Sequence, residues 1–115
     1  FFDFYYSTTQ VGYITTNGTD IFYANTSDYR SKEDLKSFDG MSLLEQIQVY
    51  DFKWKESDNR MYGVVAHELQ EVIPQAVVGE KDQEKLQAVD YSKLVPILIK
   101  SIQELKAEIE LLKNN

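Results

Sequence analysis

The C-terminal part of the chain carries a heptad repeat, which limits the possible folds more than any other sequence feature. Its apolar side chains are spaced three and four residues apart: Val95, Leu98, Ile102, Leu105, Ile109 and Leu112. A helix places these residues on one stripe, and a short helix is marginal in water unless its stripe meets a partner surface. We therefore predict a helix over residues 92–113 that forms a coiled coil between chains. The alternative is an amphipathic helix that lies on its own domain.

The number of strands in this coiled coil does not follow from the heptads. Valine and isoleucine at the first seam position, with leucine at the second, favour two strands when taken alone. Asp90 or Ser92 can cap the helix, and Pro96 then falls near its first turn, where proline is tolerated best. The pattern predicts association and leaves the choice between two and three chains open.

Residues 1–26 form a second, different segment. They hold more than half of the aromatic side chains of the chain and contain no Lys, Arg or Glu. Two β-prone runs, residues 11–16 and 20–24, flank Asn17 and Gly18, a pair typical of a hairpin turn. A two-stranded unit is marginal in water, so this segment must pack on the following domain or on copies of itself. We favour copies of itself, because the charged part that follows can close its own core.

The middle of the chain predicts a small α+β domain. Ser42 and Glu45 form a capping box at the start of a short helix that turns Leu43, Leu44 and Ile47 inward. Residues 49–54 alternate as in a half-buried strand, and residues 61–65 form the returning strand of a hairpin.

This first hairpin is expected to turn its aromatic face, Tyr50, Phe52 and Trp54, to the core. Residues 66–73 read as a short helix that Pro74 ends. Residues 76–78 and 86–89 suggest a second hairpin around a charged loop.

The composition argues against several classes of partner. A net charge of −7 and a pI near 4.6 leave no basic surface for nucleic acid. No apolar run approaches the roughly 18 residues of a membrane span. His67 and Glu68 begin like a zinc-peptidase helix, but Glu71 stands where the second histidine ligand is required. We expect no metal and no cofactor, and we interpret His67 first as a structural residue.

The junction between the two segments carries a hydroxyl and an amine. Ser27 and Lys32 lie five residues apart where the nearly uncharged segment meets the charged one. A polar connector is the simpler interpretation, because position alone does not make a serine a nucleophile.

Four strings in the second part of the chain point to a family. They are residues 27–32, residues 52–54, residues 62–70 and residues 89–91. Together they resemble the C-terminal intramolecular chaperone and auto-processing domain of phage tailspikes and tail fibres. These endosialidase-type peptidases cleave themselves with a Ser–Lys dyad. The sequence departs from the family at Ser31, where leucine is frequent, and at His67, where glutamine is frequent. Both dyad positions are intact.

The resemblance implies a biological role. Residues 27–115 would be a homotrimeric chaperone with a trimeric coiled coil, and residues 1–26 the end of a fibre stalk folded as a triple β-helix. The chaperone would hold three copies of the upstream segment in register during virion assembly in the host cytoplasm and then cut itself off beside Ser27. The stalk would remain in the virion tail. A trimerisation module of a fibre that never cuts is the alternative.

The resemblance also implies roles for individual residues. Ser27 would be the nucleophile and Lys32 its base, with Asp28, Arg30 and His67 as supporting groups. A lysine with the ordinary pKa of about 10.4 is protonated at neutral pH and cannot accept a proton. Desolvation lowers the pKa of an amine, so trimer packing around it would switch the dyad on.

Which bond beside Ser27 breaks stays open in the sequence, because cleavage after Ser27 could use another nucleophile or a bound water, but ring size favours the bond before it. The hydroxyl of Ser27 reaches the carbonyl of Thr26 through a five-membered ring, whereas attack on its own carbonyl would need a four-membered ring. We therefore predict cleavage between Thr26 and Ser27. Backbone amides, Asn59, Arg60 or His67 are the candidates for holding the oxyanion, and the sequence does not choose among them.

Overall fold

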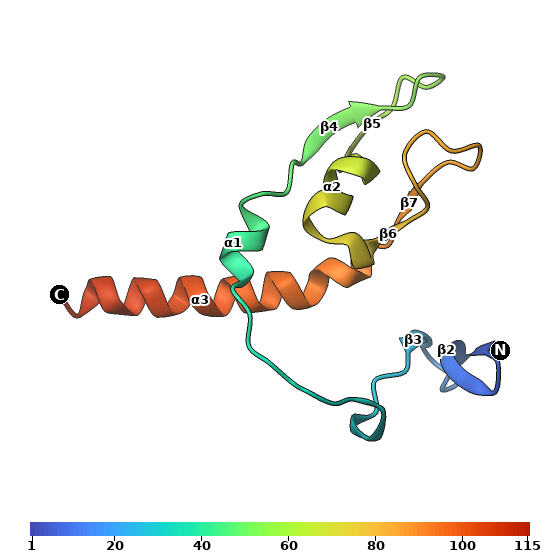
Figure 1. The fold of residues 1–115 in the computed structure, drawn as a ribbon, viewed down its shortest axis with the longest axis horizontal. Helices are drawn as coiled ribbons and strands as arrows, with labels where there is room; N and C mark the ends of the chain where they lie inside the picture. Colours follow the sequence, from blue (N-terminus) through green and yellow to red (C-terminus); the bar gives the residue numbers. More distant parts are fainter. The chain divides into compact units, whose positions relative to one another are not determined.

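The computed structural model describes all 115 residues, and its internal contacts divide the chain into two compact units. The first unit is Phe1–Ser37 and the second is Phe38–Asn115. Figure 1 shows small sheets in both units and a long C-terminal helix in the second, so the chain is of the mixed α+β class. The domain boundary predicted between residues 26 and 27 concerns the place of cutting and stays a prediction.

The first unit is a three-stranded antiparallel sheet followed by a short 3₁₀ turn. Its elements are β1 (Phe2–Tyr6), β2 (Thr9–Thr16), β3 (Ile21–Asn25) and η1 (Tyr29–Ser31), and the strand order is β1-β2-β3. The predicted hairpin between β2 and β3 is confirmed. The side-chain oxygen of Asn17 accepts the backbone N–H groups of Thr19 and Asp20 at 2.9 and 2.8 Å, and Gly18 takes a φ of +97°, which glycine adopts without strain.

Strand β1 was not predicted from the sequence. It pairs with β2 through a register shift between Phe4 and Tyr5, a bulge that hides the alternation of the strand. The sheet leaves its aromatic side chains uncovered: Phe2 is 68% exposed and Tyr23 77%. Burying these rings requires a surface that the first unit does not supply.

The second unit is built around a small apolar core. Its elements are α1 (Gly40–Leu44), β4 (Tyr50–Lys53), β5 (Arg60–Gly63), α2 (Ala66–Val72), η2 (Pro74–Ala76), β6 (Val77–Val78), β7 (Ala88–Val89), η3 (Tyr91–Leu94) and α3 (Val95–Lys113). Leu69, Ile73, Ala76 and Ile97 form the buried centre, and Leu43 and Ile47 are among the residues packed against it. The predicted stop of α2 before Pro74 is confirmed.

Both predicted hairpins of this unit exist, but the first does not turn its aromatic face to the core. Strands β4 and β5 pair, as do β6 and β7. However, Tyr50 and Trp54 are 39% and 63% exposed, and only Phe52 is half-buried. The reason is that α2, η2 and α3 build the core, while Phe52 packs on Gly63 of the facing strand. A Cβ at Gly63 would stand 2.9 Å from that ring.

The predicted capping box at Ser42 and Glu45 is wrong. Helix α1 begins at Gly40, and the carboxylate of Asp39 caps it by accepting the backbone N–H of Ser42 at 3.0 Å. Glu104 of α3 accepts the N–H groups of Gly40 and Met41 at 3.0 and 2.8 Å. Aspartate caps a helix as well as serine does, and a distant carboxylate satisfies the remaining donors.

Replacing Glu104 with alanine is expected to lower the free energy of unfolding by about 1.5–3 kcal/mol, because two partly buried N–H groups lose a charged acceptor. Chemical denaturation followed by circular dichroism measures the change. Glu108→Ala, one turn further along α3, is the matched control for charge and helix propensity. Equal effects of the two substitutions would show that Glu104 does not anchor α1.

Helix α3 begins at Val95, three residues later than predicted. Residues 91–94 form η3 instead, with Asp90 accepting the backbone N–H of Ser92 at 3.0 Å. Pro96 has no N–H to donate to the carbonyl of Ser92, so the α-helical hydrogen-bond pattern starts only after the 3₁₀ turn. No helix of the structure is both long enough and apolar enough to cross a membrane.

Helix α3 contacts its own unit through a face other than the heptad stripe. Ile97 and Ser101 are buried on that face, and α1 packs closely there. The six heptad side chains remain at least 44% exposed, and Leu112 reaches 74%. The stripe is therefore largely uncovered within the chain, although Leu98 lines an apolar hollow of its own unit. That chains associate along the stripe, and how many do so, stays a prediction.

Candidate functional site

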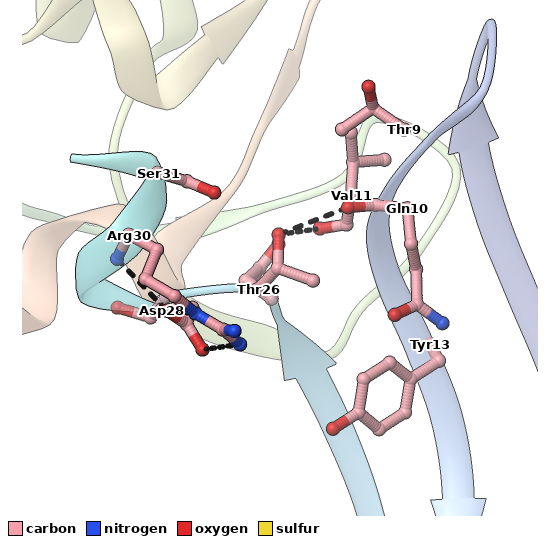
Figure 2. A pocket seen from close by; sticks show the side chains of 10 residues that line it. Thr9, Gln10, Val11, Tyr13, Thr26, Asp28, Arg30 and Ser31 are labelled. Carbon is pink, nitrogen blue, oxygen red and sulfur yellow. Dashed lines mark hydrogen bonds and ion pairs between the residues drawn. The ribbon is translucent and has the colours of Figure 1, made fainter.

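An open cleft of about 880 Å³ lies in the first unit, where β3 passes into η1. Figure 2 shows its walls, which come from β2 on one side and from the segment after β3 on the other. The lining residues are Thr9, Gln10, Val11, Tyr13, Asn25, Thr26, Ser27, Asp28, Arg30 and Ser31. The bond predicted to be cut, between Thr26 and Ser27, thus borders a space that substrate-sized groups and water can enter.

The structure brings the two predicted dyad residues into contact. The Nζ atom of Lys32 donates a hydrogen bond to the Oγ atom of Ser27 at 2.5 Å. Both side chains are exposed in the single chain. A hydroxyl and an amine at this separation can exchange a proton once the amine is neutral, which is the arrangement that nucleophilic catalysis by serine requires.

The turn η1 brings this pair together. Its backbone folds back because Ser31 donates its N–H to the carbonyl of Asp28 at 3.0 Å and Lys32 donates to the carbonyl of Tyr29 at 3.2 Å. This places residue 32 beside residue 27, although five positions separate them.

Asp28 and Arg30 hold the turn closed. Oδ1 of Asp28 accepts both the backbone N–H and the Nε–H of Arg30 at 2.9 Å, and Oδ2 accepts Nη2 at 3.0 Å. This side-chain pairing, together with the backbone bond, lowers the pKa of Asp28, and the same side-chain pairing raises the pKa of Arg30. Two of the three predicted supporting residues, Asp28 and Arg30, therefore lie beside the dyad and pair with each other.

Thr26 is fixed to strand β2 by contacts that the sequence does not predict. Its backbone N–H donates to the carbonyl of Val11 at 3.1 Å, and its hydroxyl lies 3.2 Å from the same oxygen and 3.4 Å from the carbonyl of Gln10. Figure 2 shows the threonine side chain directed at β2 across the cleft. The partners of Thr26 lie 15 and 16 residues away in the sequence, so no local sequence motif predicts the contact.

The remaining predicted site residues lie in the second unit. His67 is half-buried in the first turn of α2. Asn59 precedes β5, and Arg60 on that strand is paired with the carboxylate of Asp51 at 2.8 Å. None of these residues belongs to the unit that contains Ser27. Their predicted part in holding an oxyanion stays a prediction.

Part of the chain matches a known protein family. Residues 27–78 match the model of a peptidase family described as chaperone of endosialidase. The match begins at Ser27 and continues through β4, β5 and α2 to the end of β6. Residues 1–26, with the sheet that they form, lie outside it.

A curated protein is also similar to the chain. Myelin gene regulatory factor-like A of Dictyostelium discoideum is 32% identical over 108 aligned residues. The alignment covers 76% of the chain but only 12% of that relative. The chain therefore spans only a small part of the length of this relative.

Proposed function

We propose that the chain, whose residues 27–78 match the chaperone of endosialidase family, is a trimerising chaperone that releases itself by cutting the bond between Thr26 and Ser27. The observation that carries the proposal is the hydrogen bond of 2.5 Å between Lys32 Nζ and Ser27 Oγ. The exposed heptad stripe of α3 supports the association of chains, because an apolar stripe of this kind is stable when it packs against copies of itself.

The proposed chemistry begins with an acyl shift. The neutral amine of Lys32 takes the proton of the Ser27 hydroxyl, and Oγ attacks the carbonyl carbon of Thr26. The C–N bond breaks as the lysine returns the proton to the leaving nitrogen, which leaves an ester between Thr26 and Ser27 and a free Ser27 amine. Water then hydrolyses the ester. The products are a carboxylate on Thr26 and the restored hydroxyl of Ser27.

Assembly is the proposed switch for this reaction. Both dyad side chains are exposed in the single chain, where a protonated amine is well solvated. Packing of further chains around the cleft removes water and favours the neutral form of an amine. Cutting then follows assembly and reports it.

The proposed cargo is the segment upstream of the cut. The exposed aromatic sheet of residues 1–26 supports its being the end of a fibre stalk that is buried only when three copies combine. While the chaperone is attached, the stalk could unfold along the same low-barrier path by which it folded. Release of the chaperone would remove that path, so that the stalk persists because it unfolds slowly. In this proposal the reaction takes place in the host cytoplasm, and the stalk goes to the virion tail.

A trimerisation module that never cuts is the second candidate. The exposed heptad stripe and the exposed aromatic sheet favour association and would be the same without any reaction. The contact between Ser27 and Lys32 is what favours a cutting domain over this module.

The masses of the products test the proposal directly. The chain is expected to yield two fragments, residues 1–26 and residues 27–115, the second with a free α-amine on Ser27. Intact-mass spectrometry after assembly measures both, and N-terminal sequencing identifies the new end. A chain that stays whole while fully trimeric would support the module that does not cut, and a new end at another residue would contradict the acyl shift.

A further inference from the structure

We propose that Thr26 is a positioning residue for the cut, and that its hydroxyl determines how well the carbonyl of Thr26 is presented to Ser27. The inference deepens the proposed function and rests on it. Ser27 is the group that reacts, and Thr26 supplies the carbonyl carbon. The side chain of Thr26 takes no part in the exchange of bonds, so its effect must act through geometry.

The residue before the bond is anchored to strand β2. The backbone N–H of Thr26 continues the ladder between β2 and β3 by one step, at 3.1 Å from the carbonyl of Val11. The hydroxyl adds contacts of 3.2 Å to that oxygen and 3.4 Å to the carbonyl of Gln10. Together these contacts restrict rotation of the threonine after the regular strand has ended at Asn25.

The residue after the reactive serine is anchored as well, to a different element. Asp28 is held by three hydrogen bonds from Arg30 within η1. Ser27 therefore connects an anchored strand end to an anchored turn. Its hydroxyl also accepts the hydrogen bond from Lys32. Because Thr26 and Asp28 are both fixed, few backbone rotations remain at Ser27 and at the bond between Thr26 and Ser27. Reactions within a chain are faster when such rotations are restricted.

The hydroxyl is the part of this anchor that a substitution can remove cleanly. Thr26→Val keeps the β-branched shape and the backbone N–H but deletes the hydroxyl that contacts Val11 and Gln10. Thr26→Ser keeps the hydroxyl and loses only a methyl group. Thr19→Val is the matched control, since Thr19 is an exposed threonine in the turn before β3 and makes its contact with Asn17 through the backbone.

The rate of cutting in the assembled chain tests the proposal. Loss of one hydrogen bond is expected to slow Thr26→Val between about threefold and tenfold, while Thr26→Ser and Thr19→Val stay within about twofold of the parent. The factor by which Thr26→Val slows the cut should be the same at every pH, because the proposed base, Lys32, is unchanged. Circular dichroism and light scattering should show that all variants keep the parent's fold and chain number.

Trapping the ester separates positioning from loss of structure. Hydroxylamine attacks the ester carbonyl and displaces the serine oxygen, which leaves a hydroxamate on Thr26 and a free Ser27 hydroxyl. The trapped fraction should fall in Thr26→Val and recover in Thr26→Ser. If Thr26→Val cuts and traps like the parent while Ser27→Ala is inactive, this inference is overturned and the proposed function stands. If Ser27→Ala still releases the fragment, the proposed function itself is wrong.

Discussion

Replacing Ser27 with alanine is expected to abolish release of residues 27–115. The substitution removes the oxygen that forms the ester, and no other hydroxyl can reach the Thr26 carbonyl through a five-membered ring. The expected loss exceeds about a thousandfold, because removing one member of a nucleophile–base pair costs nearly as much as removing both. Electrophoresis of the assembled chain over several days measures it.

Two substitutions of Lys32 separate a base from a simple positive charge. Lys32→Ala is expected to slow cutting by a factor of about 10² to 10⁴, the usual contribution of a general base. Lys32→Arg should be as slow, since a guanidinium keeps its charge and its hydrogen bonds to Ser27 but does not give up its proton. An arginine variant with the parent's rate would show that Lys32 does not accept the proton.

The chain offers a close control for each change at the dyad. Ser31→Ala removes a hydroxyl from the lining of the same cleft, and Lys36→Ala removes an exposed amine that is paired only with Asp34 at 3.4 Å. Both variants should cut at the parent's rate. If Ser27→Ala and Lys32→Ala also leave the fragment pattern unchanged, the self-cleaving function is refuted and the module that only associates is favoured.

Replacing Leu105 with glutamate is expected to prevent assembly. Leu105 is 44% exposed in the single chain and lies in the middle of the heptad stripe, so the substitution leaves the core of the second unit untouched. In a coiled coil it would bury one unpaired carboxylate per chain at the same level, which costs several kcal/mol for each charge. Light scattering should then report the mass of one chain, 13.4 kDa, in place of a multiple of it.

A substitution on the opposite side of α3 controls for added charge. Gln103→Glu introduces a carboxylate two residues away on an exposed position outside the stripe, and it should leave assembly unchanged. Because assembly is the proposed switch, Leu105→Glu should also cut far more slowly than Gln103→Glu. A single chain that cuts at the assembled rate would refute the switch while leaving the chemistry of Ser27 and Lys32 intact.

Local features of the structure could be predicted from the sequence because neighbouring residues suffice to cause them. Asn17 and Gly18 close the β2–β3 hairpin through their own side chain and backbone. Pro74 ends α2 because it lacks an N–H and clashes with a continuing helix. The apolar stripe of α3 could be predicted from spacing alone, since a helix places residues three and four positions apart on one face.

Features that depend on distant partners could not be predicted in this way. Ser42 satisfies the sequence rules for a helix cap, yet Asp39 caps α1 and Glu104, more than sixty residues later, accepts its first donors. The sequence did not predict strand β1, because the register shift between Phe4 and Tyr5 interrupts its alternating pattern. Tyr50 lies in an alternating run that predicts a buried face, but it is exposed because the core is built by other elements.

The same distinction, between features that the sequence predicts and features that depend on the structure, applies to the candidate site. The sequence by itself determined that a hydroxyl, Ser27, and an amine, Lys32, stand five residues apart, and their roles as nucleophile and base stay a prediction from the resemblance of residues 27–32. Only the tertiary structure decided that η1 brings the amine to 2.5 Å from the hydroxyl and that Thr26 is tied to Val11. The physical reason is that a hydrogen bond depends on distance in space, which the turn of η1 sets for the amine and the pairing of β2 with β3 sets for Thr26.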